Sequence, residues 1–99
     1  MKIQQIFKKF GFVPISTTDK YNKIFANLAK IYESKSADYG TTAHDLFVKY
    51  GEEYYTIMVE QKITRINNLS NAETINNESL RDSWADIANY AILRLLEDE

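Results

Sequence analysis

Apolar residues recur every three or four positions along most of this 99-residue chain, which is the spacing of one face of an α-helix. The pattern is clearest over residues 78–96, where one apolar face is expected to be buried. A second face, nearly opposite, carries polar side chains and continues into Leu93, with Tyr90 and Leu96 beside it. A helix that is apolar on two sides usually has partners on two sides. The first face comprises Leu80, Trp84, Ile87, Ala88, Ala91 and Leu95, and the second carries Asp82, Asp86 and Asn89.

The same spacing predicts two further long helices, over residues 19–35 and 52–69. Thr17 or Thr18 is a suitable N-cap for the first of them. A short helix is expected from Thr42, which has capping-box spacing with Asp45, up to a break at Gly51. The expected buried stripes are Tyr21, Ile24, Phe25, Leu28, Ile31 and Tyr32 in the first long helix, and Tyr55, Met58, Val59, Ile63, Ile66 and Leu69 in the second.

The segments between these helices read as turns and loops. Residues 35–40 are expected to leave the helix, with Gly40 as the left-handed residue. Residues 67–77 form a polar loop, after which the last helix is expected to begin near Asn77 or Ser79. Ser79 again has capping-box spacing, with Asp82.

The N-terminal residues predict a short helix over 3–10 and an extended connector over 12–15. So short a helix is not stable alone and must dock on the body of the protein or on a neighbouring subunit. No stretch has a convincing strand pattern. We therefore predict an all-α fold: one domain over residues 1–99, with four or five helices in a compact bundle over 17–96 that is completed by homo-oligomerisation, as a dimer.

Composition narrows the class of protein. The chain has no cysteine, which excludes a disulfide framework and a thiolate metal site. No apolar run approaches the length of about 20 residues that a membrane span needs, and the first residues lack the apolar core of a signal peptide. We expect a cytoplasmic protein that does not enter a membrane.

Charge is distributed unevenly. Residues 1–50 carry eight basic and four acidic side chains, whereas residues 51–99 carry four basic and ten acidic ones. The halves could attract each other within or between subunits, or be two solvated surfaces that happen to differ. The basic side chains of residues 1–50 are too dispersed to argue strongly for nucleic-acid binding. Nucleic-acid binding through this half remains a third option for the function.

Three carboxylates form the strongest candidate for chemistry. If their two helices cross, Glu60, Asp82 and Asp86 would come together and supply the hard oxygen ligands that Mg²⁺ prefers, alongside the phosphates of a nucleotide. Lys62 and Arg65 would then meet the phosphates. The alternative is that the three acids are surface residues, with Asp82 capping its helix.

Other polar residues offer weaker candidates. A tyrosine beside a glycine turn, Tyr39, could stack on a base while Asp38 accepts from an exocyclic amine; the alternative is a helix-ending turn. Asn89 could orient a carboxylate or read a base. His44, the single histidine, is read as a surface or capping residue, and no residue is assigned a catalytic role.

Three segments together resemble a known family. They are Lys35-x-x-Asp38-Tyr39-Gly40, Lys62-Ile63-x-Arg65-Ile66 and Glu78-Ser79-x-x-Asp82-x-x-x-Asp86-Ile87-Ala88-Asn89-Tyr90-Ala91. In order and spacing they look like the nucleotide modification associated domain 1 family of small phage and bacterial proteins, over about residues 35–96. We therefore expect the nucleotide to be contacted by Lys35, Asp38, Tyr39, Lys62, Arg65 and Asn89.

The segment around Asp86 is also distantly similar to the last helix of the MazG-type nucleotide pyrophosphatases. Those all-α dimers or tetramers bind Mg²⁺ through paired acids. Here Asp86 matches the last acid, while Ser83 stands where a Glu is expected. The leading expectation is therefore binding of a nucleotide or modified nucleotide, with Mg²⁺-dependent hydrolysis as an extension. The alternative is a non-catalytic helical module that binds another protein.

Overall fold

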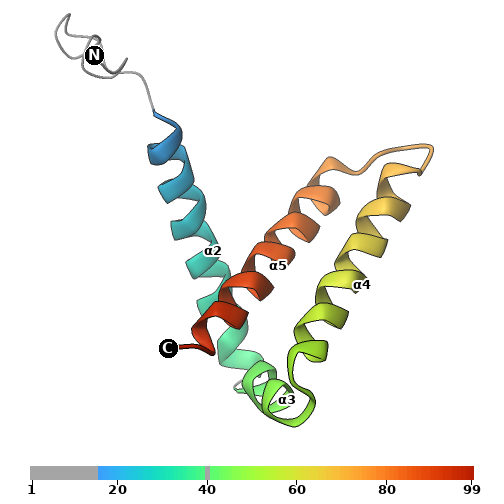
Figure 1. The fold of residues 1–99 in the computed structure, drawn as a ribbon. Helices are drawn as coiled ribbons and strands as arrows, with labels where there is room; N and C mark the ends of the chain where they lie inside the picture. Colours follow the sequence, from blue (N-terminus) through green and yellow to red (C-terminus); the bar gives the residue numbers. More distant parts are fainter. Residues whose placement is uncertain (1–15, 40) are drawn as a thin grey trace, which may run out of the picture. The chain divides into compact units, whose positions relative to one another are not determined.

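The described part of the chain is entirely helical apart from its turns. The structure is a computed structural model that describes residues 16–39 and 41–99, and no strand occurs among them, which confirms the all-α prediction. The helix predicted over 3–10 and the connector over 12–15 lie outside the described residues. None of the described helices has the length and apolarity that crossing a membrane requires. The helices are α2 (Thr17–Tyr39), α3 (Thr42–Tyr50), α4 (Glu52–Ser70) and α5 (Asn77–Leu96) (Figure 1).

The chain divides into two units, Met1–Ile31 and Tyr32–Glu99, and the boundary falls inside α2. In the described part of the first unit, α2 begins at a reciprocal cap. The backbone N–H of Asp19 donates to Ser16 Oγ at 3.0 Å, and the N–H of Ser16 donates to Asp19 Oδ2 at 3.4 Å. The cap is therefore Ser16 and not Thr17 or Thr18, because a Ser-x-x-Asp pair satisfies two N–H groups at once. The single-domain and dimer expectations stay predictions.

The stripe predicted to be buried along α2 is mostly exposed. Leu28 is buried, at 7% exposure, but Tyr21 is 60% exposed and Ile24 is 51% exposed. Tyr21 packs edge-on against Phe25 one turn later, with ring centroids 4.8 Å apart. The predicted helix is confirmed, but apolar periodicity identifies a helix face without identifying what covers it.

α2 is longer than predicted, because it continues through residues 36–39 to Tyr39. The predicted turn over 35–40 is thus wrong for its first part. None of these residues is Gly or Pro, and Ala37 is a strong helix former, so nothing in the sequence stops the helix before Gly40.

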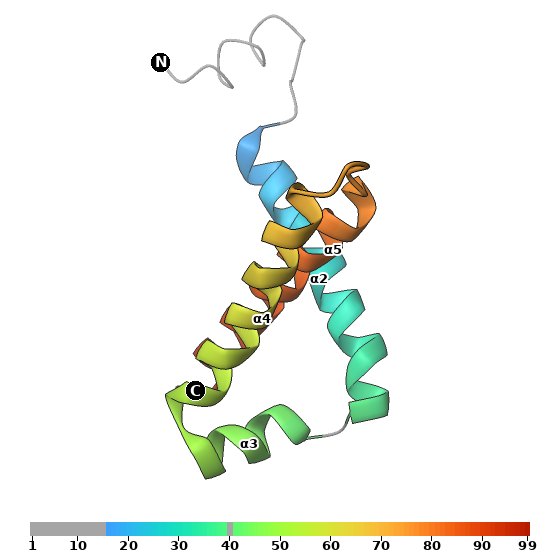
Figure 2. The ribbon, with the colours of Figure 1, turned by 90° about the vertical axis from the view of Figure 1, so that its right-hand side faces the viewer.

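α3 links the end of α2 to the start of α4 (Figure 2). Its N-cap is Thr41, whose hydroxyl donates to the side chain of Asp45 at 2.9 Å and not to the backbone. The predicted Thr42–Asp45 capping box is therefore wrong. Gly51 separates α3 from α4 at φ +73° and ψ −153°, and its N–H donates to Phe47 O at 2.7 Å. That backbone conformation is open essentially only to glycine, which explains the break that the sequence predicts here.

α4 packs against α5, and this pair provides the core of the second unit. Its buried side chains are Tyr55 and Ile66 on α4 and Ser83 on α5, at 4%, 8% and 2% exposure. Ser83 is small enough to let the helices approach, and its hydroxyl donates to Ser79 O at 2.8 Å, so it is buried without an unsatisfied polar group.

The face of α5 that the sequence predicts to be buried is only partly covered. Leu80, Ile87 and Ala88 are half-buried, whereas Trp84 and Leu95 are 59% and 66% exposed. α5 begins at Asn77, as predicted, but its capping residue differs from the prediction. Asn76 is the N-cap, and its side-chain oxygen accepts from the N–H of Ser79 at 3.0 Å, so Ser79 and Asp82 do not form the capping box.

Candidate functional site

A pocket of about 690 Å³ lies within the second unit, lined by the last turns of α2, by α3, by α4 and by α5. This volume falls within the range of about 300–1,000 Å³ that is typical of small-molecule sites. Much of its wall is aromatic or aliphatic. The apolar and aromatic contributors are Tyr32, Leu46, Tyr54, Tyr55, Met58, Tyr90, Leu93 and Leu96.

One wall of the pocket carries a carboxylate held between two lysines. Asp86 Oδ1 lies 3.1 Å from Lys35 Nζ on α2, and Asp86 Oδ2 lies 2.9 Å from Lys62 Nζ on α4. Partial burial raises the pKa of Asp86, but hydrogen bonds and charge from the two lysines outweigh it and hold that pKa below its usual value. Two ammonium groups against one carboxylate leave this wall with an excess positive charge.

The two ion pairs differ in exposure. The Lys35 side chain is 53% exposed and the Lys62 side chain 27% exposed, whereas Asp86 is 22% exposed. Exposed pairs of this kind contribute only about 0–1 kcal/mol to stability. The Lys35 ammonium can therefore leave Asp86 at little cost and turn to another anion that enters the pocket.

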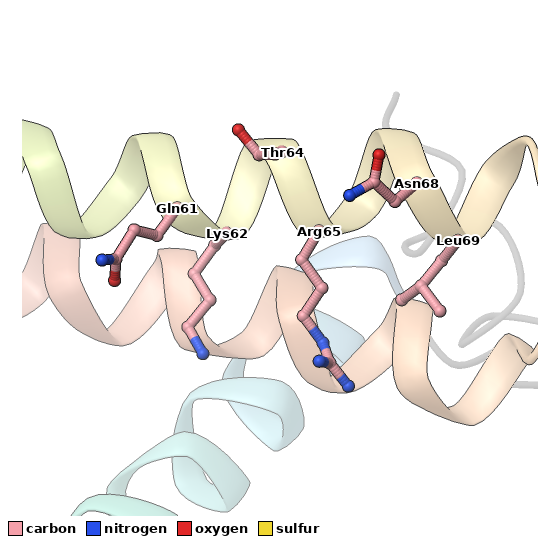
Figure 3. A pocket seen from close by; sticks show the side chains of 6 residues that line it. All are labelled: Gln61, Lys62, Thr64, Arg65, Asn68 and Leu69. Carbon is pink, nitrogen blue, oxygen red and sulfur yellow. The ribbon is translucent and has the colours of Figure 1, made fainter.

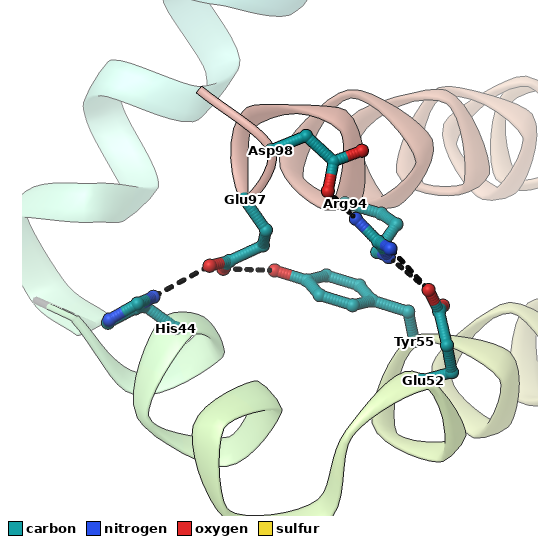
Figure 4. A network of polar contacts seen from close by, with 6 residues as sticks. All are labelled: His44, Glu52, Tyr55, Arg94, Glu97 and Asp98. Atoms are coloured by element: carbon teal, nitrogen blue, oxygen red, sulfur yellow. Dashed lines mark hydrogen bonds and ion pairs between the residues drawn. The ribbon is translucent and has the colours of Figure 1, made fainter.

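A second polar cluster joins α3, α4 and the end of α5 (Figure 4). Glu97 accepts from the Tyr55 hydroxyl at 3.1 Å through Oε1, and its Oε2 lies 2.7 Å from His44 Nδ1. Burial, followed by the hydrogen bond and negative charge of Glu97, raises the pKa of Tyr55 above its usual range. The phenol is thus held protonated and fixes the Glu97 carboxylate toward His44.

Next to this cluster, Arg94 ties the C-terminal end of α5 to the start of α4 (Figure 4). Its guanidinium donates to Glu52 through Nε at 2.6 Å and to Asp98 through an Nη at 2.9 Å. It also lies over the Phe47 ring, 5.0 Å from the centroid. The hydrogen bond from Arg94 lowers the pKa of the Glu52 carboxyl. Arg94 therefore ties α5 to α3 and α4 outside the pocket, whereas Glu97 and His44 line the pocket itself.

Four of the residues predicted from the sequence meet at the pocket: Lys35, Lys62, Asp86 and Asn89. Arg65 lies one turn after Lys62 on a separate, shallow pocket of about 510 Å³ along α4, where both cations lie on the same side of the helix (Figure 3). Asp38 and Tyr39 belong to the last turn of α2, and their side chains lie outside the described residues.

The three carboxylates expected to hold Mg²⁺ do not come together. Glu60 and Asp82 are exposed, and the described ranges contain no group of three or more His, Asp or Glu side chains that could hold a metal ion. Asp86 is already neutralised by two ammonium groups, which would repel a cation. The donor set among the described residues therefore does not fit a resident Mg²⁺.

The sequence reasoning missed several pocket residues, among them His44, Tyr54, Tyr90 and Glu97. His44 was read as a surface residue, and it is indeed exposed, but its Nδ1 is fixed by Glu97. No signal in the sequence could have found this pair, because His44 lies in the first turn of α3, Glu97 follows α5, and nothing local relates the two positions.

A family model described as nucleotide modification associated domain 1 matches residues 35–97. No curated protein and no solved structure matches the chain. The matched segment begins at the first lysine of the charged wall and ends at the glutamate that contacts His44, so it covers nearly every residue that lines the pocket. The chain belongs to the nucleotide modification associated domain 1 family.

Proposed function

We propose that the protein binds a nucleotide or modified nucleotide in the 690 Å³ pocket, with the phosphate at Lys35 and Lys62. One observation carries this proposal: two lysines from different helices converge on one carboxylate in the wall of a pocket that also contains four tyrosines. A nucleotide needs both halves of that arrangement, a cationic end for its phosphate and an apolar compartment for its base.

The base would lie among the tyrosines. Tyrosine rings present flat apolar faces, and stacking a base on an aromatic side chain is worth about 1–3 kcal/mol. Tyr32, Tyr54 and Tyr90 all line the pocket, and Asn89 adds an amide that can both donate to and accept from the edge of a base. The family name, which refers to nucleotide modification, is compatible with this assignment.

Phosphate binding would replace the Asp86 carboxylate with the phosphate as the partner of the two lysines. The incoming phosphate takes over the ammonium groups that Asp86 now holds, and a phosphate carries more negative charge than a carboxylate. The exposed Lys35 is released first, because its pair with Asp86 is the weaker one by exposure. In this proposal the chain's own residues bind the nucleotide without a resident metal, and hydrolysis is not required.

A thermal-shift and calorimetric screen of nucleoside mono-, di- and triphosphates, each with and without Mg²⁺, tests the proposal directly. A ligand that binds only the folded protein raises its melting temperature. We expect Lys62→Gln to weaken binding about tenfold or more, since a charge-assisted hydrogen bond is worth about 1.5–3 kcal/mol. Lys30→Gln, which removes the same charge from the exposed surface of α2, is the matched control.

The proposal fails if no nucleotide binds at millimolar concentration, or if Lys62→Gln and Lys30→Gln bind equally well. A shift that requires Mg²⁺ would show that the metal enters with the nucleotide. A protein that binds none of these ligands would instead fit the alternative of a helical interaction module.

A further inference from the structure

One side of α5 carries a row of residues that the second unit leaves largely uncovered: all are exposed except Ala88, which is half-buried. The row follows the alternating three- and four-residue spacing of a helix-packing face and continues one turn past the helix, where the N–H of Asp98 still donates to Leu95 O at 3.1 Å. Trp84 and Leu95 are 59% and 66% exposed, and Ala91 is also exposed. In order, the row is Arg81, Trp84, Ala88, Ala91, Leu95 and Asp98, which we call the α5 row.

The α5 row lies apart from the face of α5 that packs against α4 and from the face that lines the pocket. Ser83 is buried against α4, and Asp86 and Asn89 line the pocket. With 3.6 residues per turn, the α5 row lies on the side of α5 away from Asp86 and Asn89. A partner seated on it would leave the pocket open.

We propose that the α5 row binds the same row of a second copy of this chain, with the two helices antiparallel. The row is self-complementary in that direction. A twofold axis between Ala88 and Ala91 places Ala88 opposite the partner's Ala91 and Trp84 opposite the partner's Leu95. The same axis places Arg81 opposite the partner's Asp98 at both ends of the pair.

Size and charge both favour this arrangement. The two alanines at the centre let the helices approach closely, and the large side chains at either side then pack beside them. Each end joins a positive to a negative side chain. A parallel pair would instead place Arg81 against Arg81 and Asp98 against Asp98. Asp98 is 65% exposed despite its contact with Arg94, so its carboxylate remains accessible to a second cation.

Sedimentation of the full chain over a range of concentrations tests the proposal. A single helix pair is a small interface, so we expect a dimer that dissociates in the micromolar range. Trp84 is the only tryptophan, and its emission should shift to shorter wavelength as the dimer forms. A chain that stays monomeric at every concentration overturns the proposal, including the case in which residues 1–31 of the same chain cover Trp84.

A pair of charge reversals tests the antiparallel register. Arg81→Glu places two acids at each end of its own dimer, and Asp98→Arg places two cations there, so each variant alone should dimerise about tenfold or more less tightly. An equimolar mixture restores opposite charges at both ends and should recover the dimer as a heterodimer. That recovery also shows that both variants fold.

Val48→Glu, at a 70% exposed apolar position on α3, is the control and should leave the dimer unchanged. Two outcomes would overturn the register. One is a wild-type dimer that neither charge reversal weakens, and the other is a mixture of the two variants that associates no better than each alone.

Discussion

Lys62 on α4 and Asp86 on α5 form the closer of the two ion pairs in the wall of the pocket, with Nζ 2.9 Å from Oδ2. Lys35 binds the other oxygen of the same carboxylate. This arrangement makes Asp86 a built-in competitor for any phosphate that enters.

The competition predicts that Asp86→Asn strengthens phosphate binding in the absence of Mg²⁺. The amide keeps the shape of the side chain but no longer neutralises the lysines, so both ammonium groups become available to the ligand. Calorimetry with a nucleoside monophosphate should show an affinity gain of about fivefold or more, corresponding to about 1 kcal/mol. The opposite result, loss of binding that depends on Mg²⁺, would assign Asp86 to a metal instead.

The lowered pKa of Asp86 predicts how acid affects stability. Because the folded-state pKa lies below the usual value of 3.8, the carboxylate contributes stability that is fully present above that value and is lost as the pH falls below it. Asp86→Asn should therefore flatten the acid side of the curve of melting temperature against pH. Asp82→Asn, at an exposed position of the same helix, should leave that curve unchanged; equal effects would contradict the role of the lysines.

The Tyr55 hydroxyl predicts a stability loss without loss of packing. Tyr55→Phe keeps the ring contacts with Phe47 and Tyr54 but removes the hydrogen bond to Glu97. We expect the free energy of unfolding to fall by about 1–2 kcal/mol, since the bond involves a charged acceptor in a partly buried site. Tyr50→Phe, at an exposed position on α3, should change it by less than about 0.5 kcal/mol. A Tyr55→Phe protein with wild-type stability would show that water replaces the hydroxyl as the partner of Glu97.

The backbone conformation of Gly51 predicts a loss of stability that comes from strain and not from a lost contact. Apart from Gly51 and its two chain neighbours, no atom of the described residues lies within 4 Å of the position that a Cβ would occupy. Gly51→Ala therefore creates no clash, and its effect comes only from φ +73°. Forcing alanine into that conformation should cost about 1–3 kcal/mol in urea unfolding. Ser70→Ala, at the end of α4, is the exposed control. A Gly51→Ala protein of wild-type stability would mean that the joint between α3 and α4 can change conformation freely.

Much of the helical architecture could be predicted because it depends on local signals. The bounds of α4 and α5 follow from apolar periodicity, and the break at Gly51 follows from glycine's freedom at positive φ. The end of α2 was misplaced because helices tolerate Ser and Asp near their ends. The caps were misassigned by one to three residues because several neighbouring Ser, Thr and Asn residues can each act as a cap.

Which apolar helix faces are buried within the chain could not be predicted. Trp84 was expected in the core and Ser83 was not, yet Ser83 is buried and Trp84 is exposed. A periodic apolar stripe records that a face is suited to burial, but it does not say whether the same chain buries it. In the same way, the sequence grouped Asp86 with Glu60 and Asp82 by charge type, whereas helix crossing placed it between Lys35 and Lys62.

A pocket whose lysines are already paired with a carboxylate discriminates between ligands by their negative charge. If the site binds nucleotides as proposed, an uncharged nucleoside would gain stacking on the tyrosines but would have nothing to offer the lysines in exchange for Asp86. Weakly charged metabolites compete with that carboxylate on equal terms at best. Only a ligand with a multiply charged group attached to a flat ring gains at both ends, so the Asp86 carboxylate would give the site its selectivity by being displaced.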